Sequence, residues 1–125
     1  MKHILPAILL SLLLAPALTQ ASPAQPNDPR FGDQWGLTQI GAQCAWAVTT
    51  GSADVTVAVV DSGVDMNHPD LVDRLRTDGR DFVDGDNDPS DENGHGTNVA
   101  GIVAATLANN EGIVGLAPGI RILPI

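Results

Sequence analysis

A histidine held between two glycines constrains this chain more than any other feature of its sequence. His95 lies in the segment NGHGTNVAGI, residues 93–102. Glycine lets the backbone pack closely around a neighbouring side chain and adopt dihedrals that other residues resist. The apolar run that follows, residues 99–108, predicts a helix with Thr97 as its N-cap. Because this run is apolar on nearly every side, we expect the helix to be buried on most faces and to fix His95 at its start.

Asp61 is the carboxylate that we expect His95 to face. It follows an apolar run, residues 55–60, which predicts a strand buried on both faces of a sheet. Gly63 ends this run just beyond the aspartate. The carboxyl end of such a strand lies at the edge where open α/β sheets place their sites. Asp61 and His95 are therefore the candidate catalytic residues, although an aspartate in this place can also simply cap a turn.

Other segments predict the rest of an α/β fold. Residues 42–49 predict a helix that ends at Gly51, and residues 65–74 predict a turn followed by a short helix. Residues 79–83 and 120–123 predict two further strands. Strands separated by helical segments favour a parallel sheet with flanking helices. The apolar anchors expected before the first strand are Trp35, Leu37, Ile40, Ala45, Trp46 and Val48.

The surroundings of Asp61 and His95 resemble one protein family in residue type and in order. The apolar run into Asp-Ser-Gly resembles the aspartate motif of the subtilisin-like serine proteases, or subtilases. Gly-His-Gly-Thr followed by Val99, Ala100 and Gly101 resembles their histidine motif. The order of aspartate before histidine is also that of subtilisin. The resemblance covers nearly the whole chain after the first two dozen residues, and it implies a subtilisin-like α/β fold.

The resemblance also implies a serine endopeptidase that acts on proteins or peptides. Asp61 would orient His95, and His95 would take a proton from a serine hydroxyl. The family carries that serine far downstream, in a Gly-Thr-Ser-Met-Ala segment, and no such segment occurs here. We therefore expect residues 30–125 to be the N-terminal part of a catalytic domain, truncated after about three strands. Such a chain would be inactive without the missing C-terminal part.

The beginning of the chain predicts a secretory signal peptide. A short basic start precedes an apolar run, and small residues follow it up to Ala21. We expect cleavage after Ala21, with Ala17 and Ala24 as alternative positions, so that residues 1–21 are removed and residues 22–29 form a proline-rich linker. The mature protein would then be secreted, to an extracellular or periplasmic space. The apolar run is shorter than a membrane span requires, so no membrane association is expected after the signal is removed.

Charge and cysteine content narrow the range of partners. The chain has 15 Asp and Glu against 6 Lys and Arg, which gives a net charge of −9. A chain this acidic has no patch that could neutralise phosphates, which excludes nucleic acid as a partner. The acidity favours high solubility, bound cations, or both. Cys44 is the only cysteine, so no internal disulfide can form, and we expect it to be a small buried side chain in a helix.

A dense cluster of acids precedes the histidine motif. Carboxylates at this density either spread into solvent or gather around a cation, and hard oxygen ligands favour calcium. The segment is not an EF-hand, because Pro89 lies where that loop requires glycine. It is similar instead to the calcium-binding loop of thermitase-like subtilases. The ligands implied by this resemblance are Asp81, Asp84, Asp86 and Asp88.

The same resemblance implies a second calcium site. It would tie the N-terminal segment to the end of the histidine helix, which closes a long loop of the chain. The positions that match its ligands are Asp28, Asp70 and Asn109 through side chains, and Thr106, Glu111 and Ile113 mainly through backbone carbonyls. Without calcium, the Asn109-Asn110 pair would simply cap the C-terminus of the helix.

Two other functions fit part of the sequence. Residues 59–63 also resemble the Asp-Ser/Thr-Gly loop of aspartic proteases, and a chain of this length could dimerise to pair two carboxylates. That hypothesis leaves His95 unexplained and requires alternating strands where a helix is expected. The second alternative is a non-enzymatic, secreted calcium-binding module. Calcium binding without hydrolysis would distinguish such a module from a protease.

Overall fold

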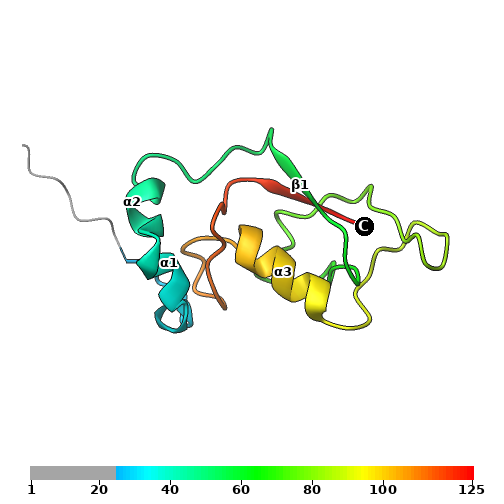
Figure 1. The fold of residues 1–125 in the computed structure, drawn as a ribbon, viewed down its shortest axis with the longest axis horizontal. Coiled ribbons are helices and arrows are strands. Elements are labelled where there is room, and N and C mark those ends of the chain that lie inside the picture. Colours follow the sequence, from blue (N-terminus) through cyan, green and yellow to red (C-terminus); the bar gives the residue numbers. More distant parts are fainter. Residues whose placement is uncertain (1–24) are drawn as a thin grey trace, which may run out of the picture.

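A computed structural model describes residues 25–125 of the protein. The predicted signal peptide and the start of the linker lie outside the described residues. The elements in chain order are η1 (Phe31–Asp33), α1 (Trp35–Gln39), α2 (Ala42–Trp46), β1 (Thr56–Val59), α3 (His95–Ala104) and β2 (Arg121–Pro124). Figure 1 shows α1 and α2 at one end and the long loop between β1 and α3 at the other. No helix within residues 25–125 has the length and apolar character needed to cross a membrane.

β1 and β2 form a two-stranded parallel sheet. The pairing runs from Thr56 beside Arg121 to Val59 beside Pro124. Both strands contact α3, which lies between them in the sequence (Figure 1). The predicted α/β fold with a parallel sheet and a flanking helix is therefore confirmed in the described part of the chain.

β1 is buried on one face only, so the prediction of a strand buried on both faces was wrong. Val59 is buried and Val57 packs against the core, whereas Thr56 and Ala58 are exposed. Val60, which follows the strand, is 77% exposed. Valines favour strands through their branched side chains, whichever face is covered. A run of valines therefore cannot tell one-sided from two-sided burial.

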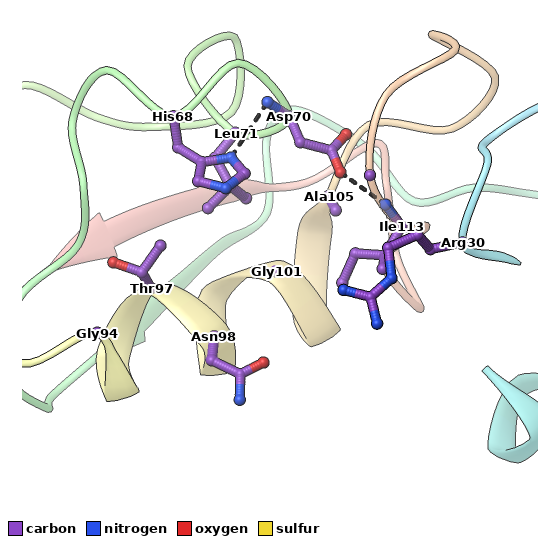
Figure 2. Close-up of a pocket in the computed structure, with 11 residues that line it drawn as sticks. Arg30, His68, Asp70, Leu71, Gly94, Thr97, Asn98, Gly101, Ala105 and Ile113 are labelled. Carbon is purple, nitrogen blue, oxygen red and sulfur yellow. Dashed lines mark hydrogen bonds between the residues drawn. The ribbon is translucent and has the colours of Figure 1, made fainter. Parts of the chain in front are cut away.

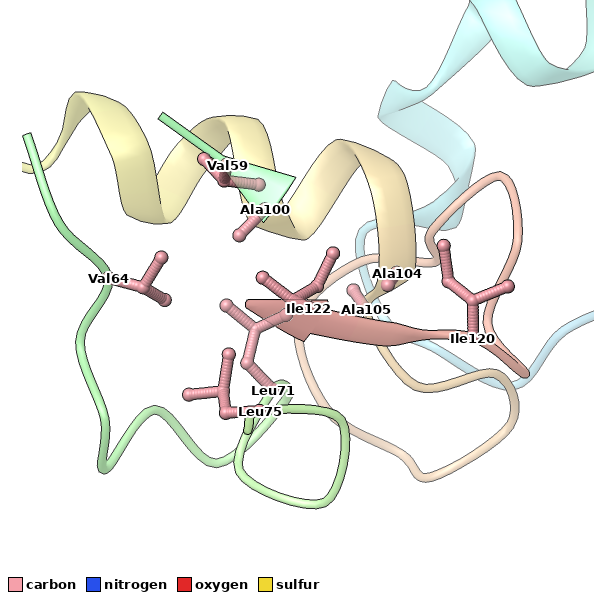
Figure 3. Close-up of a cluster of buried hydrophobic side chains, with 9 residues drawn as sticks. All are labelled: Val59, Val64, Leu71, Leu75, Ala100, Ala104, Ala105, Ile120 and Ile122. Atoms are coloured by element: carbon pink, nitrogen blue, oxygen red, sulfur yellow. The ribbon is translucent and has the colours of Figure 1, made fainter. Parts of the chain in front are cut away.

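The main core lies between α3, β2 and the segment that follows β1. Figure 3 shows Ala100 and Ala104 of α3 directed toward Ile122 of β2, with Leu71 and Leu75 below the strand. None of these five side chains is more than 7% exposed. Complete burial of one leucine stabilises a fold by roughly 1.5–3 kcal/mol. This cluster therefore holds α3 firmly against the sheet.

α3 ends at Ala104, although the sequence predicts helix as far as Ala108. The carbonyl oxygens of Ile102 and Val103 accept hydrogen bonds of 2.9 Å from the backbone N–H groups of residues 116 and 117. A longer helix would use these oxygens for N–H groups four residues on, so the tertiary contact ends the helix. Ile102 is also 55% exposed. The prediction that this helix is buried on most faces was therefore wrong.

Residues 79–83 form a loop instead of the predicted strand. The carboxylate of Asp81 accepts hydrogen bonds from the backbone N–H groups two and three residues further along, at 2.6 and 3.0 Å. Such bonds curl the chain and compete with an extended conformation. Phe82 and Val83, expected in a strand, are therefore 70% and 94% exposed.

Residues 65–74 form a series of turns and not the predicted turn and short helix. The ring nitrogen Nδ1 of His68 accepts the backbone N–H of Asp70 at 3.2 Å, which makes a local turn. Just beyond the turns, Leu75 forms a single parallel bridge to Ile122 of β2. Contact with the sheet thus draws the end of this segment into an extended path.

The residues before β1 form a second, smaller cluster. The rings of Phe31 and Trp46 pack with centroids 6.1 Å apart, and the Trp46 indole N–H donates to the Leu116 carbonyl at 2.9 Å. α1 and α2 have five residues each, so each helix can bury only a narrow side. Cys44 is exposed, contrary to the prediction. The expected anchors that are also exposed are Ala45 and, at 77%, 65% and 86%, Trp35, Ile40 and Val48.

Candidate active site

The structure brings Asp61 and His95 together at the junction of β1 and α3. Nδ1 of the His95 ring lies 2.7 Å from Oδ1 and 2.9 Å from Oδ2 of Asp61. The side chain of His95 is 66% exposed and that of Asp61 is 22% exposed. Because the carboxylate occupies Nδ1, the other ring nitrogen, Nε2, is the one available to a reactant.

The pair shifts the pKa of both partners. The hydrogen bond to His95, together with the backbone N–H of Ser62, lowers the pKa of Asp61. The hydrogen bond to Asp61, and then its negative charge, raise the pKa of His95, and the charge of Asp91 adds to this. An ionised Asp61 favours the tautomer with the proton on Nδ1, which leaves Nε2 as a base.

Asp91, which the sequence did not single out, connects the end of β1 to the start of α3. Its Oδ1 accepts hydrogen bonds from the Ser62 hydroxyl at 2.8 Å and from the backbone N–H groups of Asn93 and Gly94 at 2.9 and 2.8 Å. Its Oδ2 accepts the backbone N–H and the hydroxyl of Thr97 at 2.9 and 2.5 Å. Asp91 thus accepts the hydrogen bonds of the first turn of α3. The prediction of Thr97 as N-cap was wrong, because α3 begins at His95 and its N-cap is Gly94.

Asp91 is ionised in this setting. Burial favours its neutral form, but the hydrogen bonds from Thr97, Gly94 and Asn93 together outweigh burial and hold the pKa of Asp91 well below its usual range. A negative charge beside the first turn also stabilises a helix through the helix dipole. The only feature of the sequence that could have indicated this role of Asp91 is its position shortly before a predicted helix, and acidic residues are common there.

Two glycines allow the end of β1 and the start of α3 to approach closely. Gly63 has a φ of +94°, and a Cβ on it would lie 2.6 Å from the carbonyl oxygen of Pro89. A Cβ on Gly96 would overlap the carbonyl oxygen of Gly63 and lie 3.1 Å from the Cβ of Asp61. The close backbone packing expected around His95 is therefore confirmed at Gly96.

Comparison with known proteins gives the same picture. The family model described as the Subtilase family matches residues 52–125, which include both members of the pair. The chain belongs to the subtilase family. Membership confirms the resemblance seen in the sequence. It also excludes the dimeric aspartic protease, which in addition requires strands where α3 lies.

Individual subtilases match over most of this chain. Halolysin from Haloferax mediterranei is 52% identical over 97 residues, which are 73% of this chain and 18% of halolysin. Thermitase from Thermoactinomyces vulgaris is 48% identical over 101 residues, 80% of this chain and 36% of thermitase. The halolysin-like extracellular serine protease Nep from Natrialba magadii is 39% identical, over 74% of this chain and 18% of Nep. The chain thus spans between 18% and 36% of the length of these relatives.

A solved protease structure has the same fold. A protease from Pseudoalteromonas arctica matches with a TM-score of 0.69 and 33% identity, over 81% of this chain and 38% of that protein. The subtilisin-like α/β fold predicted from the sequence is therefore confirmed.

The acidic loop of this subtilase, residues 81–90, shares a cleft of about 580 Å³ with Asp61. Asp81 and Asp86 bond to backbone N–H groups two residues on, and Asp88 accepts the hydroxyl of Ser90 at 2.6 Å. Within residues 25–125, no group of three or more His, Cys, Asp and Glu side chains is placed to hold a metal ion. The loop is held by local turns in the structure, and its four calcium ligands, which include Asp84, stay a prediction.

The other predicted calcium ligands include two buried carboxylates. Asp28 and Asp70 are 4% and 1% exposed. Asp28 accepts the backbone N–H groups of Ala108 and Asn109 at 3.0 and 3.3 Å. Asp70 accepts the side-chain amide of Asn109 and the backbone N–H of Ile113, both at 3.0 Å. The ion pairs within residues 25–125 include neither of them. Two buried carboxylates without a basic partner fit the oxygen donors that a hard cation requires.

The remaining predicted ligands lie in the loop after α3. The backbone N–H of Thr106 donates to the Asp70 carbonyl at 3.0 Å, and that of Glu111 donates to Oδ1 of Asn109 at 3.0 Å. Figure 2 shows Asp70 and Ile113 on one side of a cavity of about 320 Å³ beside α3. The structure thus gathers these residues in one place, while their binding of calcium stays a prediction.

Proposed function

We propose that residues 30–125 are the N-terminal part of the catalytic domain of a secreted serine endopeptidase. The observation that supports this is the contact of 2.7 Å between Asp61 and Nδ1 of His95. In the proposed mechanism, Asp61 keeps the proton on Nδ1. Nε2 of His95 then takes the proton of a serine hydroxyl as its oxygen attacks the peptide carbonyl, and returns that proton to the leaving amine.

The nucleophilic serine is proposed to come from polypeptide outside these 125 residues. Each serine within residues 25–125 donates its hydroxyl to an aspartate: Ser52 to Asp54 at 3.2 Å, Ser62 to Asp91 at 2.8 Å and Ser90 to Asp88 at 2.6 Å. The chain also spans at most 36% of the length of the three relatives. Loss of the nucleophile alone lowers turnover about 10⁶-fold in subtilisin, where it was measured, so the chain would be inactive alone.

Secretion is proposed from the signal-like start of the chain, and the name of the relative Nep, an extracellular protease, supports it. The substrate class is protein or peptide. The net charge of −9 argues against nucleic acid as a partner.

We also propose calcium as a structural cofactor. Asp28, Asp70 and Asn109 would supply side-chain ligands, with Thr106, Glu111 and Ile113 adding backbone carbonyls. Bound calcium would neutralise two buried carboxylates and join the N-terminal segment to the loop after α3. It takes no part in the proton transfers assigned to His95. The acidic loop would hold a second ion through Asp81, Asp84, Asp86 and Asp88.

The complete protein that contains this chain provides the test. We expect it to hydrolyse peptide substrates, to be inhibited by a serine-directed phosphonate, and to lose activity about 10⁶-fold in His95→Ala. The matched control is His68→Ala, which removes the other histidine of the described part and should change turnover no more than a few-fold. A complete protein that binds calcium without hydrolysing peptides would instead be the non-enzymatic module.

A further inference from the structure

Ser62 and Asp91 have no role in the proposed proton transfers, yet they make the densest set of hydrogen bonds around the pair. Ser62 uses both its backbone and its side chain. Its backbone N–H donates to Oδ1 of Asp61 at 2.8 Å, and its hydroxyl donates to Asp91 and accepts the backbone N–H of Gly96 at 3.0 Å. One residue thus contacts the carboxylate on one side and the first turn of α3 on the other.

We propose that Ser62 and Asp91 are positioning residues that fix the Asp61 carboxylate against the His95 ring. This inference rests on the proposed function, because it assigns the two residues a role in the chemistry of that site. Neither residue touches the reacting atoms. They act by joining the end of β1 to the start of α3.

The path of the chain explains why such a junction is needed. Asp61 and His95 are 34 positions apart, and the residues between them form turns and loops with one isolated bridge. No helix and no strand of the sheet lies between them, so contacts at the junction add to the packing of α3 on the sheet in fixing the distance between carboxylate and ring. The Ser62–Asp91 hydrogen bond spans 29 positions and closes this loop next to the pair.

Asp91 completes the junction on the helix side. Its two oxygens accept five hydrogen bonds, one from Ser62 and four from residues at the start of α3. The ring of His95 belongs to the first residue of that helix. A shift of the first turn would therefore move the ring relative to Asp61. A misplacement of about 1 Å in an active site can lower the rate on the order of 10²-fold.

The first test is kinetic and uses the complete enzyme. Ser62→Ala removes one donor and one acceptor from the junction and leaves the backbone bond to Asp61 in place. We expect kcat to fall about 10- to 100-fold with KM nearly unchanged, because the substrate contacts are intact. The matched control is Ser52→Ala, since the hydroxyl of Ser52 also bonds to an aspartate, Asp54, but on the surface. A kcat in Ser62→Ala equal to that of the control would overturn the proposal.

The second test does not depend on catalysis. The proton on Nδ1 of His95 should give a far-downfield resonance in a proton NMR spectrum, because it is held against a carboxylate. Ser62→Ala should weaken or shift this resonance, and Ser52→Ala should not. If the wild-type protein shows the resonance but no hydrolysis, the proposed function fails. In that case the positioning role is still tested, by comparing the resonance of Ser62→Ala with that of the wild type. An unchanged resonance in Ser62→Ala rejects the positioning role.

A pair of substitutions of equal shape keeps the proposal testable if Ser62→Ala does not fold. Ser62→Thr retains a hydroxyl and Ser62→Val replaces it with a methyl group. We expect the threonine variant to keep the His95 resonance and most of the turnover, and the valine variant to lose both. Equal behaviour of the two variants would show that the hydroxyl does not position the pair.

Discussion

Aspartates in two regions of this molecule are used in opposite ways. The buried pair, Asp28 and Asp70, accepts hydrogen bonds from residues 80 and 43 positions away. In the acidic loop, the carboxylates of Asp81 and Asp86 accept bonds from residues only two or three positions away. The first region joins distant parts of the chain, and the second shapes only its own turns.

The difference shows that burial, and not the number of acids, decides what a carboxylate contributes. A buried acceptor that is removed leaves its donors without partners and without water. An exposed acceptor is replaced by water at little cost. A buried carboxylate without a basic partner is also the one that gains most from a cation, because burial penalises its charge. Each of these consequences can be measured.

The largest effect is expected for Asp70→Ala. The substitution leaves the Asn109 amide and the Ile113 N–H without an acceptor in a site that is 1% exposed. At about 1–3 kcal/mol for each unpaired group, the free energy of unfolding should fall by about 3 kcal/mol. Urea denaturation measures this. For Asp84→Ala, a matched change in the acidic loop, the free energy of unfolding should fall by less than about 0.5 kcal/mol. Equal losses in the two variants would show that the buried and exposed aspartates do not differ in this way.

The next effect is that of calcium on thermal stability. At a calcium concentration 100 times the dissociation constant, the native state should gain about 2.7 kcal/mol, seen as a higher Tm. A chelator should reverse the gain, and Asp70→Ala should abolish most of it. Magnesium is the control, because it prefers a rigid octahedral site and keeps its waters. A Tm that is unaffected by both calcium and chelator would reject both proposed sites.

A smaller effect concerns Asp91, which is only partly buried but strongly hydrogen-bonded. Its pKa is lowered in the folded protein, so the stability it contributes is complete above the ordinary value of 3.8 and is lost as pH falls toward the lower folded value. Wild-type Tm should therefore drop on acidification below about pH 4, near the unfolded carboxylate pKa. Asp91→Asn should start from a lower Tm and show a flatter dependence over that range. A parallel dependence in both proteins would contradict the assigned ionisation.

The contact between Asp61 and His95 and the α/β fold could be predicted because the short segments involved carry recognisable patterns. The apolar run before Asp61 and the glycines beside His95 indicated the strand, the helix and their close approach. The α1 helix was not predicted, since its five residues carry no periodic pattern. The predicted strand at residues 79–83 was wrong because the side chain of Asp81 bonds to the local backbone.

Other features depend on contacts between distant residues that no sequence motif marks, and these could not be predicted. The end of α3 is set by residues 116 and 117, which reach back to its last turn. The role of Asp91 depends on the hydroxyl of Ser62, 29 positions away. The burial of Asp28 and Asp70 was not predicted, because aspartates are mostly exposed and the groups that bond to these two lie 80 and 43 positions away in the chain. Local sequence does not contain these pairings, and the folded chain supplies them.

An effect as small as that of Asp84→Ala is expected for Asp86→Ala in the acidic loop. Its carboxylate accepts a single exposed bond of 2.9 Å, from the backbone N–H of Asp88, and water can replace that bond. Without calcium, the free energy of unfolding should change by less than about 0.5 kcal/mol. With calcium, the Tm gain should be smaller than in the wild type, because the loop is proposed to hold a second ion, and an unchanged gain would show that the buried pair alone binds calcium. Urea denaturation measures the change in free energy, and thermal denaturation with and without calcium measures the Tm gain. A loss above about 1 kcal/mol without calcium, well outside the usual range for exposed substitutions, would show that the loop contributes to the fold as the buried pair does.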